Sequence, residues 1–524
     1  MPTEALPVED HPAGMDVQPR FTARHGLWLI AATLLAAALR LWHLGEWSFW
    51  VDEAHTWRDV TWPLEGGSGF LGTDRGKYPL AFLLLHGLRS AGLLGDDEFS
   101  LRLPFALLGI ASVPLLALCG RRLVGPTAAV VAALLCAVHP WHIFWSQNAR
   151  GYMLVFVASI VVVDRAVCWT QHRRKRDLVL GVLALLVAAL SHPTGLILGV
   201  GVGAFVLLLP FAGADGQRLL LVAGITLAVV TAGSILMAKF GPYQEFMGSK
   251  GTPAPLHFPQ TVAYYFRPAL LLAALGGLVL AGLWWSSLRG LLVTCMLLAP
   301  FIVLLAIGGS LVKATARYAF CTLPLWLLLA GKAGAPWLEG ARAKAVLRTL
   351  PAALVGAIVA CDLVTETIAY HHEQFGQRPR WREACTFAAE HARARGGRGA
   401  LRVLTILHPP TAYYLQRYHW TAEGANMYPL VDLEALLRSR IEDGEGPAGA
   451  EHQGHPFLRQ QQAAADSRGE ALVVMVKLPE LAEIDAGGAF LRALQEGFEL
   501  ALYLPCWVGP KDESLYVYVP RGER

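Results

Sequence analysis

Charged residues are scarce in this 524-residue chain, where Asp, Glu, Lys and Arg together make up 16%. Hydrophobic residues make up 54%, and the mean hydropathy is +0.43. This balance excludes an ordinary soluble globular domain, in which about a quarter of the residues carry a charge. We therefore predict a protein that crosses a membrane several times.

An excess of charge of one sign is also missing. The net charge is +4 and the basic residues are scattered, which excludes nucleic acid as a partner. The eight cysteines include no Cys-x-x-Cys pair, so no zinc or redox motif is predicted. Six of them lie in apolar runs. Cys385 and Cys506 lie in the polar C-terminal part, where they either form a disulfide or remain free thiols.

Long apolar runs, in contrast, recur throughout the first 370 residues. We expect an N-terminal cytoplasmic tail at 1–24, a transmembrane domain of about twelve helices at 25–369 and a first extracytoplasmic loop at 45–77. No small-residue cleavage site follows the first run, so it is predicted to be an uncleaved helix. The expected spans are 27–44, 78–94, 103–119, 128–145, 153–169, 178–190, 195–211, 219–237, 262–285, 291–309, 318–331 and 350–368.

The basic clusters predict which ends of these spans face the cytoplasm. By the positive-inside rule, the clusters at 121–122, 173–176 and 342–348 lie inside, and the C-terminal part then lies outside the inner (plasma) membrane. Strict alternation from an inside N-terminus nevertheless puts 173–176 outside. One early segment is therefore miscounted: 78–94 or 103–119 does not cross, or a crossing lies within 45–77.

The composition changes at about residue 370, and 370–524 is long enough for one small domain. Its short β-rich runs alternate with helical patterns, which predicts an extracytoplasmic α/β domain. The segment 444–468 has little apolar periodicity and is either a mobile loop or an exposed helix. The expected strands are 401–407, 471–477, 499–504 and 515–519, and the expected helices are 380–393, 410–418 and 479–495.

Two adjacent carboxylates, Asp52 and Glu53, follow the first apolar run, where the bilayer meets water and unpaired charge is costly. In one interpretation, one of them is a general base for an acceptor hydroxyl, and the other orients a group or binds a metal. In the other interpretation, the pair only caps a short amphipathic helix. The pair alone leaves both interpretations open.

Three cations and a histidine stand at the ends of other apolar runs. Lys77, Arg150 and Arg317 could each neutralise a phosphate. A snorkelling lysine and an ordinary cytoplasmic arginine are the alternatives for the first two, whereas Arg317 lies against the positive-inside trend. His192 separates two apolar runs, where it binds a metal or the substrate, or is a buried structural histidine.

Five short motifs, taken in order, resemble the dolichyl-phosphate-mannose protein mannosyltransferase-like superfamily, which includes bacterial aminoarabinose lipid A transferases and other membrane glycosyltransferases of the C-type fold. Each motif is weak by itself, but the set spans the whole membrane part. The motifs are Trp-Val-Asp-Glu-Ala at 50–54, Lys-Tyr-Pro-Leu at 77–80, Phe-Ser-Leu-Arg-Leu-Pro at 99–104, Ser-Gln-Asn-Ala-Arg-Gly-Tyr at 146–152 and Ala-Arg-Tyr at 316–318.

The resemblance implies an inverting sugar transfer on the outer face of the membrane. The donor would be a polyprenyl-phosphate sugar, and the hydroxyl acceptor a protein, a polysaccharide or a lipid. It implies that Asp52 is the catalytic base and Glu53 its acidic neighbour. The residues implied for the donor phosphate are Lys77, Arg150 and Arg317, and those for the rest of the substrate are Tyr152, His192 and Tyr318.

The chain departs from the lipid A branch at two motifs, because Tyr78-Pro79 replaces two prolines and 149–152 lacks a nearby acid. We therefore expect no required cofactor or metal, with a divalent metal as the open alternative, and no assignment to lipid A. The main rival function is a transporter or a lipid-linked-sugar flippase, but no internal symmetry is visible. An N-glycosylating enzyme is disfavoured because the motif Trp-Trp-Asp is absent.

Overall fold

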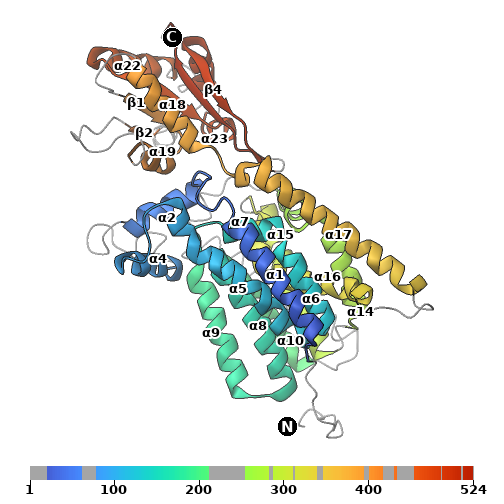
Figure 1. The fold of residues 1–524 in the computed structure, drawn as a ribbon. Helices are drawn as coiled ribbons and strands as arrows, with labels where there is room; N and C mark the ends of the chain where they lie inside the picture. The colour runs from blue at the N-terminus through green and yellow to red at the C-terminus, as the bar shows by residue number, and fades with distance from the viewer. Residues whose placement is uncertain are drawn as a thin grey trace, which may run out of the picture.

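The computed structural model describes residues 20–61, 78–211, 254–282, 287–310, 313–338, 346–394, 401–416, 430–432, 454–485, 487–508 and 511–522. It consists of a bundle of long helices with a smaller α/β domain at one end (Figure 1). The candidate residue Lys77 and the predicted span 219–237 lie outside the described residues.

The bundle is formed by the first 370 residues. Most of its helices run roughly along one direction, and α2 and α4 lie at the end that carries the α/β domain (Figure 1). Its elements are α1 (Ala23–Leu41), α2 (Val51–Thr61), α4 (Leu80–Ser90), α5 (Glu98–Val124), α6 (Pro126–Ala137), α7 (Pro140–Ser146), α8 (Tyr152–His172), α9 (Lys175–Ser191), α10 (Thr194–Leu208), α13 (His257–Phe266), α14 (Pro268–Leu280), α15 (Leu288–Ser310), α16 (Leu323–Leu338), α17 (Val346–His372) and the short 3-10 helices η2 (Leu209–Phe211) and η3 (Ala316–Thr322).

Seven helical spans in the described part of the chain are long and apolar enough to cross a membrane, or nine if each of two bent pairs counts as one span. The polytopic helical class is confirmed, but the predicted number of about twelve spans is not. The pair α6 and α7 bends by 65° at Pro140, and the pair α13 and α14 bends by 82° at Pro268. Proline explains both breaks, since it has no N–H to donate and its ring clashes with the preceding turn.

The early segment 78–94 contains only a short helix. Its helix α4 has 11 residues and is therefore about 16 Å long, roughly half the thickness of the hydrocarbon core. Helix α5 has 27 residues and begins after Asp97, whose Oδ1 accepts the Ser100 N–H at 2.9 Å. With α4 removed from the count, the clusters 121–122 and 173–176 fall at the same end of the bundle, opposite α2.

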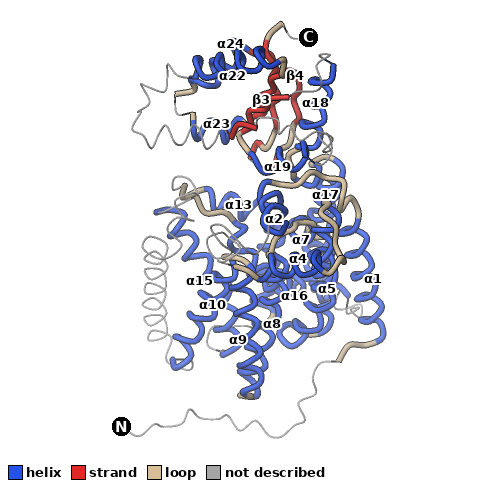
Figure 2. Tube along the Cα trace, turned by 90° about the vertical axis from the view of Figure 1, so that its left-hand side faces the viewer, coloured by secondary structure: helices blue, strands red, loops and turns tan. Residues whose placement is uncertain are grey.

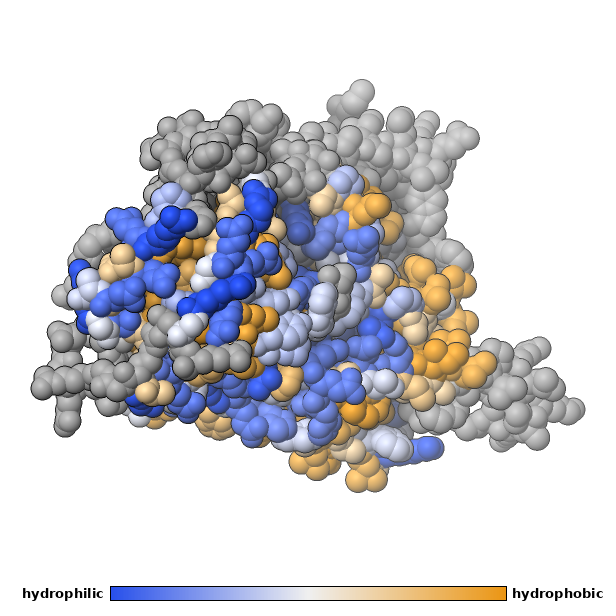
Figure 3. Space-filling model, turned by 90° about the horizontal axis from the view of Figure 1, so that it is seen from above, coloured by the Kyte–Doolittle hydropathy of each residue, from blue (hydrophilic) through white to orange (hydrophobic). Residues whose placement is uncertain are grey.

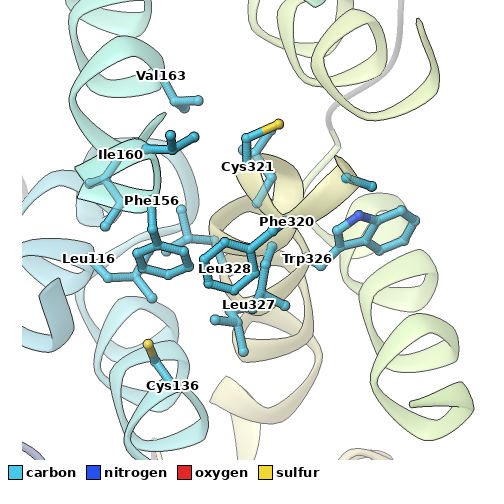
Figure 4. Close-up of a cluster of buried hydrophobic side chains, with 14 of the residues drawn as sticks. Leu116, Cys136, Phe156, Ile160, Val163, Phe320, Cys321, Trp326, Leu327 and Leu328 are labelled. Atoms are coloured by element: carbon cyan, nitrogen blue, oxygen red, sulfur yellow. The ribbon is translucent and has the colours of Figure 1, made fainter. Parts of the chain in front are cut away.

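The core of the bundle fixes the position of η3. Figure 4 shows part of this core, where side chains of α5, α8, η3 and α16 interlock. The rings of Phe156 on α8 and Phe320 on η3 lie 5.3 Å apart, and both are fully buried. Inside a bilayer such close packing, rather than the hydrophobic effect, holds helices together. The packing of Phe320 therefore positions Arg317, one turn earlier.

The C-terminal part is an α/β domain with a mixed sheet in the order β2-β1-β3-β7-β4. Strand β1 is parallel to both of its neighbours, and β7 is antiparallel to both of its own. The elements are η5 (Phe375–Gln377), α18 (Trp381–Ala394), β1 (Leu401–Thr405), α19 (His408–Tyr414), β2 (Leu430–Asp432), α22 (Gly454–Arg468), β3 (Ala471–Val476), α23 (Leu478–Ile484), α24 (Ala489–Gly497), β4 (Phe498–Leu504), β5 (Trp507–Val508), β6 (Lys511–Asp512) and β7 (Leu515–Pro520).

Helices cover both faces of this sheet, as Figure 2 shows for α18 on one side and α22 with α24 on the other. Successive strand residues point to opposite faces. On β1, Val403 packs in the core beneath α18, whereas Leu404 packs in the core beneath α22 and α24. A strand buried on both faces has an almost unbroken run of apolar residues, which is why β1 and β3 could be predicted from the sequence.

Most of the expected elements of this domain are present, and the short strands β2, β5 and β6 were not expected. The predicted helix 479–495 is two helices, α23 and α24, because Gly488 adopts a left-handed conformation with φ 65° between them. Within 444–468, residues 454–468 form the helix α22. Cys385 and Cys506 are both buried and free.

The exposed surface fits a membrane protein with a polar domain at one end. Viewed from the side of the α/β domain, hydrophilic residues cover much of the described surface, and apolar side chains gather toward one side (Figure 3). On the bundle, large apolar residues such as Leu178, Leu183 and Leu186 of α9 are about half exposed. Such residues are stable in contact with lipid rather than water.

Candidate active site

Asp52 and Glu53 occupy the first turn of α2, where the helix dipole favours acidic side chains. Consecutive residues of a helix point about 100° apart, so the two carboxylates face different surroundings. Glu53 is completely buried, whereas the Asp52 side chain remains 30% exposed. The structure thus gives different environments to two carboxylates that the sequence motif does not distinguish.

Glu53 lies between two arginines that are also completely buried. Its Oε1 accepts from Arg102 Nε at 2.7 Å, and its Oε2 accepts from Arg102 Nη2 at 2.9 Å and from Arg378 Nε at 3.1 Å. Burial by itself raises the pKa of Glu53, but the charges of Arg102 and Arg378 outweigh this effect and lower it to about 2. Glu53 is therefore a fixed anion at neutral pH.

Arg102 joins Glu53 to the segment that leads into α2. Its remaining three N–H groups donate to the carbonyl oxygens of Leu44, Trp47 and Ser48, each at 3.0 Å. All five donors of this buried guanidinium are thus used, which removes the penalty of burying unpaired polar groups. Arg102 belongs to the motif at 99–104, which gives that motif a physical role.

Arg317 lies beside Asp52, with its Nη1 3.9 Å from Asp52 Oδ2. The guanidinium also lies 5.2 Å from the ring centre of Tyr318, and the Arg317 side chain is 25% exposed. Its buried Nε has no hydrogen-bond partner within the described part of the chain. The pair is open to a ligand, unlike the closed arrangement around Glu53.

Arg150 approaches the same region from the link between α7 and α8. It is 7% exposed, and its guanidinium lies 5.9 Å from the ring centre of Tyr78. Its two terminal nitrogens lie 3.4 Å from Thr56 Oγ1 and 3.5 Å from the Tyr78 hydroxyl, so both contacts are long. Arg150 therefore lies at the same end of the bundle as α2, opposite the arginine clusters 121–122 and 173–176.

Aromatic rings fill the space between these charges. Tyr152 stacks on Trp145 with 3.6 Å between ring centres, and its other side meets His192 at 3.9 Å. Gly151 makes this approach possible, because a Cβ there would lie 2.1 Å from the carbonyl oxygen of Ser191. The close contact brings the break between α9 and α10 against the start of α8.

The structure brings most of the predicted site residues together. Four charged or phenolic side chains lie within electrostatic range of Tyr152, which itself contacts His192; these four are Asp52, Arg150, Arg317 and Tyr318. Glu53 faces away from this cluster.

Arg378 was not predicted from sequence. It lies 325 residues beyond Glu53 and carries no motif, so only the fold reveals the contact.

The described residues near Asp52 do not form a recognisable metal site. In the described ranges no group of three or more His, Cys, Asp or Glu side chains is arranged to hold an ion. The side chain that faces Asp52 is the cation Arg317, whose positive charge opposes a metal ion at the same carboxylate. We therefore derive no step through a metal.

Part of the chain is similar in sequence to a family of known proteins. Residues 78–237 match the sequence model of the family Dolichyl-phosphate-mannose-protein mannosyltransferase. No curated protein sequence matches the chain significantly.

Two solved structures have a similar fold. The oligosaccharyltransferase AglB of Archaeoglobus fulgidus, in complex with an inhibitory peptide and a dolichol-phosphate, has a TM-score of 0.54 at 14% identity over 94% of this chain and 74% of that one. ArnT of Cupriavidus metallidurans in the apo state has a TM-score of 0.50 at 14% identity over 95% and 98%. Likeness at this level of identity concerns the fold.

The fold and the site together define a polytopic membrane protein of the C-type glycosyltransferase fold. The match of residues 78–237 to a mannosyltransferase family and the two similar folds support a likeness to the superfamily of dolichyl-phosphate-mannose protein mannosyltransferases and related membrane glycosyltransferases. The resemblance found in the five sequence motifs is thereby confirmed.

Proposed function

We propose that the chain transfers a sugar from a polyprenyl-phosphate donor to an acceptor hydroxyl, with inversion at the anomeric carbon. The observation that carries the proposal is the partly exposed Asp52 carboxylate beside Arg317, at 3.9 Å, with Arg150 and the rings of Tyr152 and His192 in the same cluster. The match to a mannosyltransferase family and the dolichol-phosphate held by AglB support this donor class.

The proposed reaction needs one base and several cations. The acceptor oxygen bonds to the anomeric carbon while the bond from that carbon to the phosphate oxygen breaks. Asp52 takes the proton of the acceptor hydroxyl. The polyprenyl phosphate leaves with one additional negative charge, which Arg317 and Arg150 neutralise together with Lys77. A phosphate needs no proton to leave, so the site requires no general acid.

The other predicted residues receive roles that follow from their surroundings. We assign Glu53 a supporting role, because its pKa of about 2 and its two arginine partners keep it from accepting a proton. Tyr318 is partly exposed and offers a ring face to the sugar. Tyr152 and His192 are buried against each other, so we assign them to the wall of the substrate site. Whether the acceptor is a protein, a polysaccharide or a lipid is left to experiment.

The proposed site faces the outside of the cell membrane. With the N-terminus inside, α1 leads outward, α4 does not cross and α5 returns, so the cluster 121–122 lies inside. The bent pair α6 and α7 then leads outward and α8 returns, which places 173–176 inside as well. If α9 also crosses, His192 joins Asp52 and Arg150 outside. The positive-inside rule supports this arrangement throughout the first half of the chain.

Sugar transfer in membranes from labelled polyprenyl-phosphate sugars tests the function. Asp52→Asn is expected to lower the rate by about 100-fold or more, because it removes the base. Asp96→Asn is the matched control, since Asp96 is similarly exposed, at 35%, and pairs with Arg89 away from the cluster. Transfer that survives Asp52→Asn at equal expression would refute the mechanism.

The same assay separates the rival function and the metal alternative. A flippase would move the labelled lipid across vesicle membranes without forming a glycosylated product. Addition of EDTA is expected to leave transfer unchanged, and a loss that is restored by a divalent cation would establish a metal requirement.

Cysteine labelling tests the orientation in a background without the exposed Cys361. Glu46→Cys is expected to react with an impermeant reagent from outside, and Arg176→Cys only after the membrane is opened. Labelling with the opposite pattern would overturn the proposed orientation.

A further inference from the structure

We infer that the C-terminal domain completes the active site, with Arg378 and Tyr414 as positioning residues that hold the segment 46–53 and therefore Asp52. The activity test of this inference rests on the proposed function, whereas its hydrogen-exchange test does not. Two separate bridges of hydrogen bonds, one at each end of the segment, carry it.

The first bridge is Arg378, which lies just after the helix η5 at the start of the C-terminal domain. Its Nε donates to Glu53 Oε2 at 3.1 Å, and its Nη2 donates to the carbonyl oxygen of Gln147 at 2.6 Å. One buried guanidinium thus holds both the first turn of α2, which carries Asp52, and the link that carries Arg150. Movement of Arg378 would disturb the base and a phosphate ligand together.

The turn before Arg378 is shaped for this contact. Gly376 adopts φ 62°, and a Cβ there would lie 2.2 Å from the ring of Trp47. Only glycine fits this close approach without displacement. Arg378 Nη1 donates to the Gly376 carbonyl oxygen at 2.7 Å and to the Tyr370 hydroxyl at 3.2 Å, so its position is fixed from four directions.

The second bridge joins α18 and α19 to the first half of the segment. The Tyr414 hydroxyl accepts the Phe49 N–H at 2.6 Å and donates to Glu98 Oε1 at 2.9 Å. Tyr413 donates to the other oxygen of Glu98 at 3.0 Å, and Arg382 donates to Glu98 Oε1 at 2.6 Å. Arg382 also donates to the carbonyl oxygen of Glu46 at 2.7 Å.

The first bridge also has an electrostatic consequence. Arg102, Arg378 and Glu53 form a completely buried group with a net charge of +1, and Glu53 is the neighbour of Asp52 in the first turn of α2. Loss of Arg378 would remove that positive charge and make ionisation of Asp52 less favourable. Other groups around Asp52 act on the same equilibrium and stay constant in such a variant: Arg317 and Tyr318 of η3, Arg150 of the α7–α8 link, Tyr152 of α8 and His55 of α2.

The catalytic test compares Arg378→Gln, Arg378→Lys and the matched control Arg380→Gln in the purified full-length protein. Arg380 lies two residues away and pairs with Glu383 on the surface of the domain. Arg378→Gln is expected to lower kcat by about 10-fold or more with donor KM little changed. Because Arg378→Gln removes a positive charge from the group around Glu53, the residue next to Asp52, the acid limb of the pH profile is expected to move to higher pH.

Arg378→Lys keeps the charge and is expected to retain the parental acid limb. A purely structural role for Arg378 predicts less folded protein but a parental kcat and pH profile per folded molecule. That result, or equal behaviour of Arg378→Gln and Arg380→Gln, would overturn the inference.

Hydrogen exchange supplies a readout that needs no activity. Exchange in 46–61 is expected to accelerate in Arg378→Gln and in Tyr414→Phe, which removes one hydroxyl from a folded domain. The control Tyr503→Phe changes an exposed residue of β4 and is expected to leave the segment protected. Unchanged protection in both test variants would refute the positioning role. An inactive parent with the expected exchange pattern would instead refute only the proposed function.

Discussion

Replacement of Glu53 by glutamine is expected to destabilise the protein strongly, whereas Asp52→Asn is expected to remove activity and leave stability nearly unchanged. The two residues are neighbours with the same charge, so the difference arises entirely from their surroundings. A glutamine at 53 would put an NH₂ group either against Arg102 and the Ala149 N–H, which donate to Oε1, or against Arg102 and Arg378, which donate to Oε2. It would also leave two buried guanidiniums without a counter-charge.

The magnitude follows from the pKa of Glu53. Each pKa unit is worth about 1.36 kcal/mol, so a lowering from 4.5 to about 2 corresponds to roughly 3 kcal/mol of stability. Loss of one partner from a buried ion pair costs about 3–5 kcal/mol in general, which agrees. The partly exposed pair of Asp52 and Arg317, at 3.9 Å, contributes less than about 1 kcal/mol.

The sign of the pH dependence is fixed by the direction of this pKa change. A carboxyl group with a folded-state pKa below its unfolded value stabilises the protein above the unfolded value. The contribution of Glu53 is therefore complete above about pH 4.5 and is lost as the pH falls toward 2. In Glu53→Gln, this part of the acid destabilisation is expected to be absent.

Thermal unfolding of the purified protein in detergent measures the effect. At roughly 2 °C per kcal/mol for a chain of this size, Glu53→Gln is expected to lower Tm by about 6–10 °C. Asp52→Asn is expected to stay within about 2 °C of the parent. Similar Tm values for both variants, or a larger loss at Asp52, would show that the buried arginine cluster does not stabilise the fold as argued.

Two further changes test other parts of the structure. Gly151→Ala is expected to abolish most sugar transfer at near-normal expression. The new methyl group would displace Ser191 and disrupt the contact between the α9–α10 break and α8. Parental activity in this variant would refute the close approach. Glu513→Gln is expected to destabilise the C-terminal domain by about 2–3 kcal/mol. Burial by itself raises the pKa of Glu513, but the charges of Lys477 and Lys511 outweigh burial and lower the pKa to about 2, so the ionised carboxylate stabilises the folded domain. Chemical unfolding followed in that domain would detect the loss, which should also appear in the parent below about pH 4.5.

Several features of the fold could be predicted because they depend on local sequence alone. The scarcity of charge and the long apolar runs indicate a polytopic membrane protein, since an unpaired polar group in lipid is costly wherever it stands in the chain. The strands β1 and β3 were predictable because each is a short apolar run buried on both faces. The number of spans was not, because 78–94 is apolar enough for a span but its helix α4 ends after 11 residues.

The candidate site divides in the same way. The sequence by itself determined that Asp52, Arg150 and Arg317 are charges at the ends of apolar segments, where function or pairing must explain them. It left Asp52 and Glu53 equivalent. Only the tertiary structure separated them, because the 100° turn between neighbours on α2 directs one carboxylate toward Arg317 and buries the other. The charge of Arg378 that holds the buried carboxylate comes from 325 residues away, and no local pattern encodes a contact at that separation.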